Sequence, residues 1–500
     1  MNTKNITSLY AVTLVVICLC ILCFKYLWSR RYLYYYASQF EGPFAWPLIG
    51  SVHLFWEGHK GFHKKMTEIF SSQASIFKFW LGQDLLIVTS KPSDIEILSN
   101  SCLEKGKFYN LGKNIVREGL LNEPVSKWKV NRKIINPTFN SAVLNSFVDV
   151  FCAHSKELVQ TLESNCDGNP FDFLMKIFHC SLNISIETLC DIKPSLIQDK
   201  DQFIEKILRM EEIMTIRVFS IWLHPDYIFK YTLLGREFEK LTEETFEFIN
   251  KITNTKKANF RNQNTIGDLK RKQFLNHLFS VAEKESALTE HVISEETQTI
   301  LVTASETAAI TISMILLVLS LRRDILEKVN DELDSIFDSV ERNATLEDMN
   351  RMVYLECVIN ETMRLFPTVP IVLRTVTENV KLDTYVVPKG SFVLIPICNI
   401  HLKPDIWKDP MTFNPDRFLY QKEATRHRCA FIPFSYGFRN CIGFKYGLMS
   451  MKIILSTLLR SYNFEAVDYK STNDIKLLYS IVSKPANGFK FRISKLDCKK

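Results

Sequence analysis

Several features that would divide or specialise a chain are missing from this one. Beyond residue 50 the 500-residue sequence has no stretch rich in proline, glycine and serine that would serve as a linker, and it has no internal repeat. Its 13 cysteines are scattered mostly without paired spacing, which argues against a disulfide scaffold and favours a reducing compartment. Lysine and arginine form no clustered stripe, so the net charge of +7 does not indicate nucleic-acid binding. We expect one large globular unit behind a short N-terminal segment.

That N-terminal segment is a membrane-anchor candidate. Leu9–Phe24 is an uncharged apolar run of sixteen residues, just long enough to span a bilayer if Lys25 snorkels to the interface. A signal peptide would carry its basic residues before the apolar run, whereas here Lys25, Arg30 and Arg31 follow it. The positive-inside rule then places the rest of the chain in the cytosol.

The most informative stretch is Phe434–Gly443, which reads Phe-x-x-Gly-x-Arg-x-Cys-x-Gly. It holds Cys441 in a glycine-framed turn, where backbone N–H groups can approach a sulfur atom. A cysteine thiolate is the electron-donating ligand that iron needs in order to cleave an O–O bond. Arg439 can pair with a carboxylate through its planar fork. Taken alone, Cys441 would more often be a small buried hydrophobe.

This stretch matches every fixed position of the haem-binding signature of the cytochromes P450, and the chain resembles that family from its proline hinge to its end. The resemblance implies a haem b held by Cys441 as axial ligand, with Phe434, Gly437 and Arg439 in the cofactor-binding loop. It also implies a mainly α fold with a smaller β portion, behind an N-terminal transmembrane helix. We expect the anchor at residues 1–31, an interfacial segment and proline-rich hinge at 32–50, and the catalytic haem domain at 51–500.

Patterns along the body agree with this fold class. Most of the sequence between residues 90 and 365 has helical periodicity. Ile76–Leu81 and Leu85–Thr89, separated by three turn-forming residues, predict a β-hairpin. Near the C-terminus, Ile481–Ser483 and Phe489–Ile493 flank a Pro- and Gly-containing stretch and predict a second hairpin.

Two further groups of residues resemble family constellations. Trp128 and Arg132 lie four apart on one predicted helix face, and together with Arg374 they resemble contacts to the haem propionates. Glu361, Arg364 and Arg417 resemble a buried triad that locks the core around the haem. Buried charges persist only when fully paired, so we assign this triad a structural role. The alternatives are a core tryptophan with a solvated arginine, and an ordinary surface ion pair.

A long helix is predicted from about Ser294 to Ser320, with small residues in its middle. That middle resembles the family's oxygen-activation motif, in which Glu306 and Thr307 would relay protons to bound dioxygen. The chain departs from the motif at Ala304, where glycine is common, and at Ala308, where a second threonine is frequent. The alternative, that Glu306 merely solvates an exposed helix face, fits poorly with the apolar helix that follows.

The resemblance implies a monooxygenase that inserts one oxygen atom of O2 into a lipophilic substrate: a fatty acid, hormone, odorant or xenobiotic. The sequence after residue 399 is most similar to family 4, the branch that includes insect clan 4. Some members of that branch esterify a glutamate to the haem at the position held here by Thr303, so no covalent link is expected. Two alternatives remain: a P450-fold isomerase or dehydratase of oxygenated lipids, and a non-catalytic haem-binding membrane protein.

The same resemblance implies the partners. Electrons would come from NADPH through NADPH-cytochrome P450 reductase, with cytochrome b5 as a second candidate donor. The expected location is the endoplasmic reticulum membrane, with a single span and the catalytic domain on the cytosolic face. The positive net charge suits docking to an acidic partner.

Overall fold

The computed structural model describes residues 3–46, 49–55, 68–69, 74–261, 272–284, 288–338, 340–419, 426–478 and 480–496. In these residues the helices are α1 (Thr3–Ala37), α3 (Pro92–Ser101), α4 (Lys107–Asn110), α5 (Lys113–Val116), α6 (Val125–Ile135), α7 (Ser141–Asn145), α8 (Val148–Leu162), α9 (Leu174–Cys190), α10 (Lys200–Phe219), α11 (Asp226–Tyr231), α12 (Leu233–Arg261), α14 (Phe274–Ala282), α15 (Glu290–Leu321), α16 (Arg323–Phe337), α17 (Leu346–Arg351), α18 (Val353–Leu365), α19 (Ile397–Ile400) and α21 (Phe444–Leu459). The strands are β1 (Ile76–Leu81), β2 (Asp84–Thr89), β3 (Phe171–Asp172), β4 (Val372–Thr375), β5 (Val380–Lys381), β6 (Val386–Val387), β7 (Phe392–Ile395), β8 (Tyr462–Ala466), β9 (Leu477–Leu478), β10 (Lys484–Pro485) and β11 (Lys490–Lys495). The predicted fold class, mainly helical with a small β portion, is confirmed.

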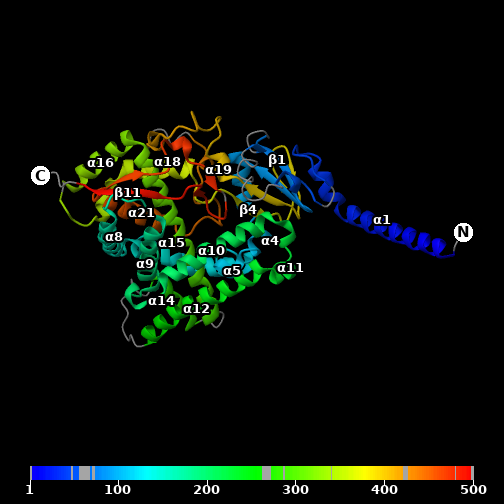
Figure 1. The fold of residues 1–500 in the computed structure, drawn as a ribbon, viewed down its shortest axis with the longest axis horizontal. Coiled ribbons are helices and arrows are strands. Elements are labelled where there is room, and N and C mark those ends of the chain that lie inside the picture. The colour runs from blue at the N-terminus through cyan, green and yellow to red at the C-terminus, as the bar shows by residue number, and fades with distance from the viewer. Residues whose placement is uncertain are drawn as a thin grey trace.

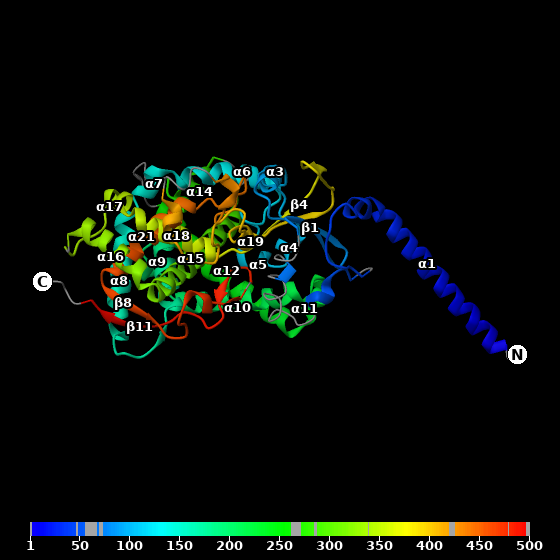
Figure 2. The same cartoon turned by 90° about the horizontal axis from the view of Figure 1, so that it is seen from above.

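Helix α1 projects from the body as an isolated rod, and the N- and C-termini lie at opposite ends of the molecule (Figures 1 and 2). The most apolar window within Val12–Ala37 has a mean hydropathy of 2.2, and none of that window is buried. An exposed apolar helix of this length suits a bilayer and would be unfavourable in water. The helix runs without a break past residue 31, and Ala37 and Phe40 pack into the core beside Trp80.

The largest sheet has the strand order β1-β2-β7-β4 and lies next to the base of α1 (Figure 1). Strands β1 and β2 pair antiparallel, so the first predicted hairpin is confirmed. The second predicted hairpin is wrong. Strand β11 pairs with β8 and β3, while Lys484 and Pro485 form the short strand β10 against β9. The stretch between residues 481 and 489 therefore joins two different sheets.

The long helix predicted near Ser294–Ser320 is confirmed as α15, which begins at Glu290 and ends at Leu321. The Thr289 side chain caps its start by accepting the N–H of Val292. Although α15 is apolar enough to cross a bilayer, 83% of its most apolar window is buried inside the protein. It packs against α9, α12, α18 and α21, so it is the central helix of the core and not a second membrane span.

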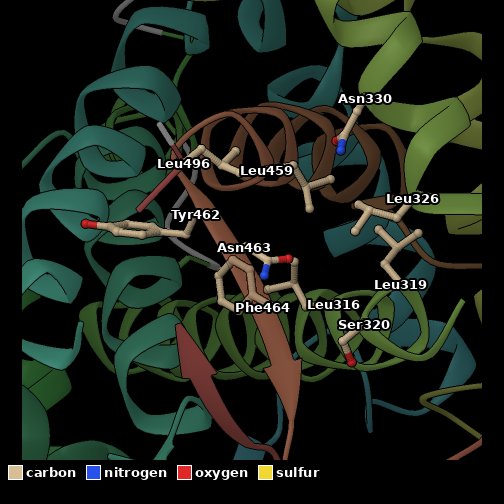
Figure 3. A pocket seen from close by; sticks show the side chains of 10 residues that line it. All are labelled: Leu316, Leu319, Ser320, Leu326, Asn330, Leu459, Tyr462, Asn463, Phe464 and Leu496. Atoms are coloured by element: carbon tan, nitrogen blue, oxygen red, sulfur yellow. The ribbon is translucent and has the colours of Figure 1, made fainter. Parts of the chain in front are cut away.

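A small cavity beside the C-terminal half of α15 illustrates how tightly the core is packed (Figure 3). Its volume is about 20 Å³, which is room for roughly one water molecule. Side chains from α15, α16, α21 and β8 line it, among them the polar Ser320, Asn330 and Asn463. It is too small for an organic ligand, so the chemistry of this protein lies elsewhere.

Candidate active site

The loop before α21 presents Cys441. The Cys441 N–H donates to the Phe434 carbonyl at 2.9 Å, and the Gly443 N–H donates to the Cys441 sulfur. Cys441 is exposed, yet protein atoms surround it closely enough that burial raises the pKa of its thiol, while the Gly443 N–H and the positive charges of Arg132 and Lys105 lower it.

Backbone geometry explains the glycine at position 437. Gly437 has a φ of +79°, and a Cβ there would meet the Ser99 carbonyl oxygen at 2.7 Å. The loop therefore crosses the end of α3 too closely for any side chain. Gly443 differs, because its φ is −90° and a Cβ there would meet only Phe139, at 3.9 Å. Contacts with the protein's own atoms therefore require glycine at position 437 but not at position 443.

Arg439 is buried and donates to three backbone carbonyls. Its guanidinium nitrogens lie 3.0 Å from the oxygen of Leu103, 3.3 Å from that of Leu120 and 2.6 Å from that of Glu123. Its guanidinium carbon stands 4.3 Å from the ring centre of Trp128, a cation–π contact. Burial, with a smaller contribution from nearby positive charge, lowers the pKa of Arg439 to about 10.

Arg132 and Arg374 contact the same loop from two sides. Arg132 on α6 donates to the backbone and side-chain oxygens of Asn440, at 3.0 and 3.1 Å. Arg374 on β4 is fully buried and donates to the carbonyl of Leu373 at 2.9 Å and to the Ser435 hydroxyl at 3.4 Å. The Nε of Arg374 has no hydrogen-bond partner among the described residues. A buried donor without an acceptor is costly, so this one is available to a ligand.

Sequence reasoning missed Lys105, the fourth cation of the site. Its side chain is buried, with its ammonium 4.5 Å from the ring centre of Tyr109. Burial, and then the charges of Arg374 and Arg439, lower the pKa of Lys105 well below its ordinary value, while Cys441 raises it. Lys105 lies in a loop between α3 and α4, where an isolated lysine normally reaches solvent. The sequence around it therefore gives no indication that it belongs to the site.

Of these four side chains, Arg132 and Lys105 lie close enough to the thiol for their charge to act on it. In the described part of the chain, the hydrogen bonds of Arg132, Arg374 and Arg439 go to carbonyl, amide and hydroxyl oxygens. Burial lowers the pKa of Arg439, and the smaller effect of the nearby Glu104 and Glu123 charges raises it. Buried positive charge of this kind requires an anion. A flat cofactor with two carboxylate groups and an iron that accepts the Cys441 sulfur fits this set of donors.

The middle of α15 offers a face of small and hydroxylated residues. Thr303, Ala304, Thr307 and Ala308 are half-buried, whereas the positions around them are fully buried. Their spacing places them on one side of the helix. The Thr307 hydroxyl donates to the Thr303 carbonyl at 2.7 Å, which leaves its oxygen free to accept a hydrogen bond. This face has the small side chains that close approach of a flat cofactor requires.

Glu306 lies beside that face and is buried. Its Oε1 stands 3.0 Å from Nζ of Lys484, on strand β10. The same ammonium lies 3.2 Å from Oε2 of Glu211, on α10. The expected acid is thus next to Thr307 in the chain, but it pairs with Lys484, which also binds Glu211, and sequence reasoning identified neither residue.

Glu361, Arg364 and Arg417 meet as the sequence resemblance implied. Two nitrogens of Arg364 lie 2.7 and 2.8 Å from the Glu361 oxygens, and both side chains are fully buried. Arg417 approaches the same carboxylate at 3.4 Å, and the N–H of Asn414 donates to it at 2.7 Å. Arg364 also donates to the His401 carbonyl at 2.9 Å. These contacts fasten α18 to the segment after α19.

Comparison with known proteins places these features in a family. The sequence profile described as Cytochrome P450 matches residues 41–491. The chain is 30% identical to a Drosophila melanogaster protein named Cytochrome P450 4g15, over 93% of this chain and 93% of that one. It is 30% identical to Cytochrome P450 4c3 of the same organism (94% and 91% covered) and to human Cytochrome P450 4V2 (90% and 88% covered).

Proposed function

The chain belongs to the cytochrome P450 family and is a monooxygenase of that family; from this premise we propose that the Cys441 thiolate would hold the iron of a haem b. The observation that carries the proposal is the Cys441 loop, where the charges of Arg132 and Lys105 act on the thiol and the buried Nε of Arg374 has no acceptor among the described residues. Burial disfavours the thiolate form of Cys441, and a bound iron ion would offset that effect. The relatives' names carry the family 4 designation, in agreement with the sequence resemblance.

The propionates of the haem would be held by Arg374, Arg439, Arg132 and Lys105. Arg374 is the strongest candidate because its Nε is buried without an acceptor. Arg439 contributes charge, while its bonds to three carbonyls and its stacking on Trp128 keep it in place. Charge-assisted hydrogen bonds of this type are the strong ones in proteins.

When bound, the haem supplies the iron at which dioxygen is reduced and one oxygen atom is inserted into the substrate. The chain's own part is to deliver protons and to exclude bulk water. We assign the proton supply to Glu306, and we assign to Thr307 the hydrogen bond that orients a water or an oxygen atom over the half-buried face of α15. The Thr303 carbonyl already fixes the Thr307 hydroxyl.

The substrate class is a lipophilic molecule such as a fatty acid, hormone, odorant or xenobiotic. The support is the apolar core around α15 and the membrane helix α1, which gives access to the lipid phase. Thr303 cannot form the ester link that a glutamate at this position would allow, so the haem is held without a covalent bond from α15.

Two other functions were weighed. A P450-fold isomerase or dehydratase needs no proton relay to dioxygen, and the Glu306–Thr307 pair argues against it. A non-catalytic haem-binding membrane protein would share the Cys441 loop but would have no use for a buried acid beside Thr307. The monooxygenase accounts for both features.

Helix α1 fits a single membrane anchor. We place the protein in the endoplasmic reticulum membrane with its body on the cytosolic face, because the basic residues follow the apolar run. Electrons would arrive from NADPH through the reductase of that membrane, with cytochrome b5 as a second donor.

The test is turnover of the full-length protein in membranes with the reductase, NADPH and isotope-labelled dioxygen, against a panel of lipophilic compounds. We expect a product that carries one labelled oxygen atom and forms only with NADPH and reductase together. Product that forms without dioxygen, or that carries no label, would support the isomerase or dehydratase and overturn the proposal. Ligand binding without any product across the panel would support the non-catalytic protein.

A further inference from the structure

A buried cluster of two acids and one base joins three elements that are distant in the sequence. Glu306 comes from α15, Glu211 from α10 and Lys484 from β10. The Lys484 ammonium lies 3.0 Å from a Glu306 oxygen and 3.2 Å from a Glu211 oxygen. Because one ammonium contacts both, the two carboxyl groups lie close together on either side of Lys484.

A hydrogen bond between two carboxyl groups requires a proton, because ionised carboxylates only accept. Two ionised glutamates with one lysine would carry a net negative charge in a buried place, whereas one shared proton makes the cluster neutral. Burial, and then the nearby Glu306, raise the pKa of Glu211 well above its ordinary value, while Lys484 lowers it. Among the described residues, the charges that act on Glu211 are those of Glu306 and Lys484.

The cluster has one open end. The side chains of Glu211 and Glu306 are only 7% and 4% exposed, whereas that of Lys484 is 25% exposed. Burial alone would lower the pKa of Lys484, but the two carboxylates raise it, so the lysine stays charged. Solvent therefore meets the cluster at a fixed cation, and the acids lie behind it.

We propose that Glu211 and Lys484 are positioning residues for the proton supply through Glu306: Glu211 holds the one proton of the pair and passes it to Glu306, from which it is given away. This inference rests on the proposed role of Glu306. In the step, the O–H bond of the Glu211 carboxyl breaks and an O–H bond forms on the Glu306 carboxylate. Glu211 is left as a carboxylate beside Lys484, and water at the exposed end of the cluster returns one proton to it.

The geometry also explains why the base is a lysine on a short strand. Lys484 holds both acids at once, so neither can turn away without leaving a buried charge unpaired. The contact ties α10 and β10 to the middle of α15, next to Thr307. Each proton transfer then begins from one arrangement of the two acids.

The experiment uses the full-length, haem-loaded protein and the variant Glu211→Gln, which keeps the size of the side chain and removes its acid proton. The matched control is Glu212→Gln, the next residue of α10, which is 63% exposed and pairs with Arg209. The first readout is infrared absorption of protonated carboxyl groups at neutral pH, in H2O and in D2O. Glu296, buried beside Glu123, would absorb in the same region when protonated, so the native-minus-variant difference makes the assignment.

We expect Glu211→Gln to lose a carboxylic-acid band that the native protein and Glu212→Gln both show and that shifts in D2O. If the native protein and Glu211→Gln show the same carboxylic-acid bands, the proposal of a shared proton is wrong. If Glu211→Gln does not fold, Lys484→Met tests the same claim, because removing the cation should increase the carboxylic-acid band, and an unchanged band would overturn it.

The second readout is the yield of product per NADPH, with its solvent isotope effect and pH profile. In Glu211→Gln we expect the yield to fall by about tenfold, less than the roughly 100-fold or more expected for loss of a direct proton donor. The native yield should decline as pH rises, because the shared proton is lost, and the variant should show a flatter profile. An unchanged yield, isotope effect and pH profile would overturn the positioning role.

The two proposals fail in different ways. If Glu306→Gln keeps the native yield and isotope effect, the proposed role of Glu306 is wrong whatever Glu211 does. If Glu306→Gln lowers the yield and Glu211→Gln does not, only the inference about Glu211 is wrong. The infrared band reports the proton at the acid pair independently of turnover.

Discussion

The carboxylate of Glu361 and the guanidinium of Arg364 face each other through two contacts of 2.7 and 2.8 Å, and both side chains are completely buried. The pair sits one helical turn from the end of α18, where Arg364 also reaches the carbonyls of His401 and Pro410. It holds the helix against the chain segment that leads to the Cys441 loop.

Removing one partner of this pair should unfold the region. Glu361→Ala leaves Arg364 buried without its counter-ion, which costs about 3–5 kcal/mol. We expect little or no folded, haem-containing protein on expression. Asp324→Asn is the control, because the Arg322–Asp324 pair is exposed and such pairs contribute about 0–1 kcal/mol. Normal yield and haem content of Glu361→Ala would contradict a structural role for the triad.

The two glycines of the Cys441 loop should respond differently to alanine. Gly437→Ala puts a Cβ 2.7 Å from the Ser99 carbonyl oxygen at a positive φ, and overpacking of this kind costs about 1–3 kcal/mol. Gly443→Ala meets only Phe139, at 3.9 Å, and should cost less. The measurement is the thermal unfolding temperature of both variants in the same detergent. Equal values for the two would contradict the loop geometry.

His401 should make the protein sensitive to acid. Its Nε2 accepts the N–H of Ile432 at 2.9 Å, and burial, with the nearby charge of Arg364, lowers the pKa of His401 to about 3. The pKa of His401 in the unfolded chain is about 6.5. Below that pH the unfolded chain binds a proton at His401, whereas the folded protein keeps this imidazole neutral. The stability present above pH 6.5 is therefore lost as pH falls toward 3.

The loss should reach about 2 kcal/mol by pH 5, at about 1.4 kcal/mol per pH unit. The check is the unfolding temperature of the native protein and of His401→Gln between pH 7.5 and 5. The variant amide can still accept the Ile432 N–H but does not titrate. We expect a steeper fall for the native protein, and parallel curves would show that His401 is not held neutral.

Thr307→Ala should separate electron use from product formation. The variant lacks the hydroxyl that bonds to the Thr303 carbonyl at 2.7 Å, and with it the group that we propose orients a proton-carrying water next to Glu306. We expect NADPH consumption to continue while hydrogen peroxide replaces most of the product, with the yield down by about tenfold or more. Thr307→Ser, which keeps a hydroxyl, is the control and should retain most of the yield. Unchanged yield in Thr307→Ala would remove Thr307 from the proton supply.

The parts of this molecule that could be predicted from sequence are those whose residues are close together in the chain. The Cys441 loop occupies one short stretch, and Glu361 and Arg364 lie three residues apart on one helix. The length and apolar character of α15 are also visible in the sequence. For such features local geometry already decides which side chains meet.

The parts that could not be predicted depend on distant segments. Glu211 and Lys484 are 273 residues apart, and each looks like an ordinary charged surface residue in its own sequence context. The prediction of a C-terminal hairpin was wrong for the same reason, because β11 pairs with β8 and not with the segment that directly precedes it in the chain. Lys105 became a site residue only when its loop folded against Arg374 and Cys441.

The central claim is that the Cys441 sulfur is the ligand of a haem iron. It is tested most directly by the absorption spectrum of the reduced, carbon-monoxide-bound protein in membranes, beside Cys441→Ser. The account predicts a strongly red-shifted Soret band in the native protein and its loss in the variant. A band at the shorter wavelength of histidine-ligated haem, or the same red-shifted band in both proteins, would contradict it.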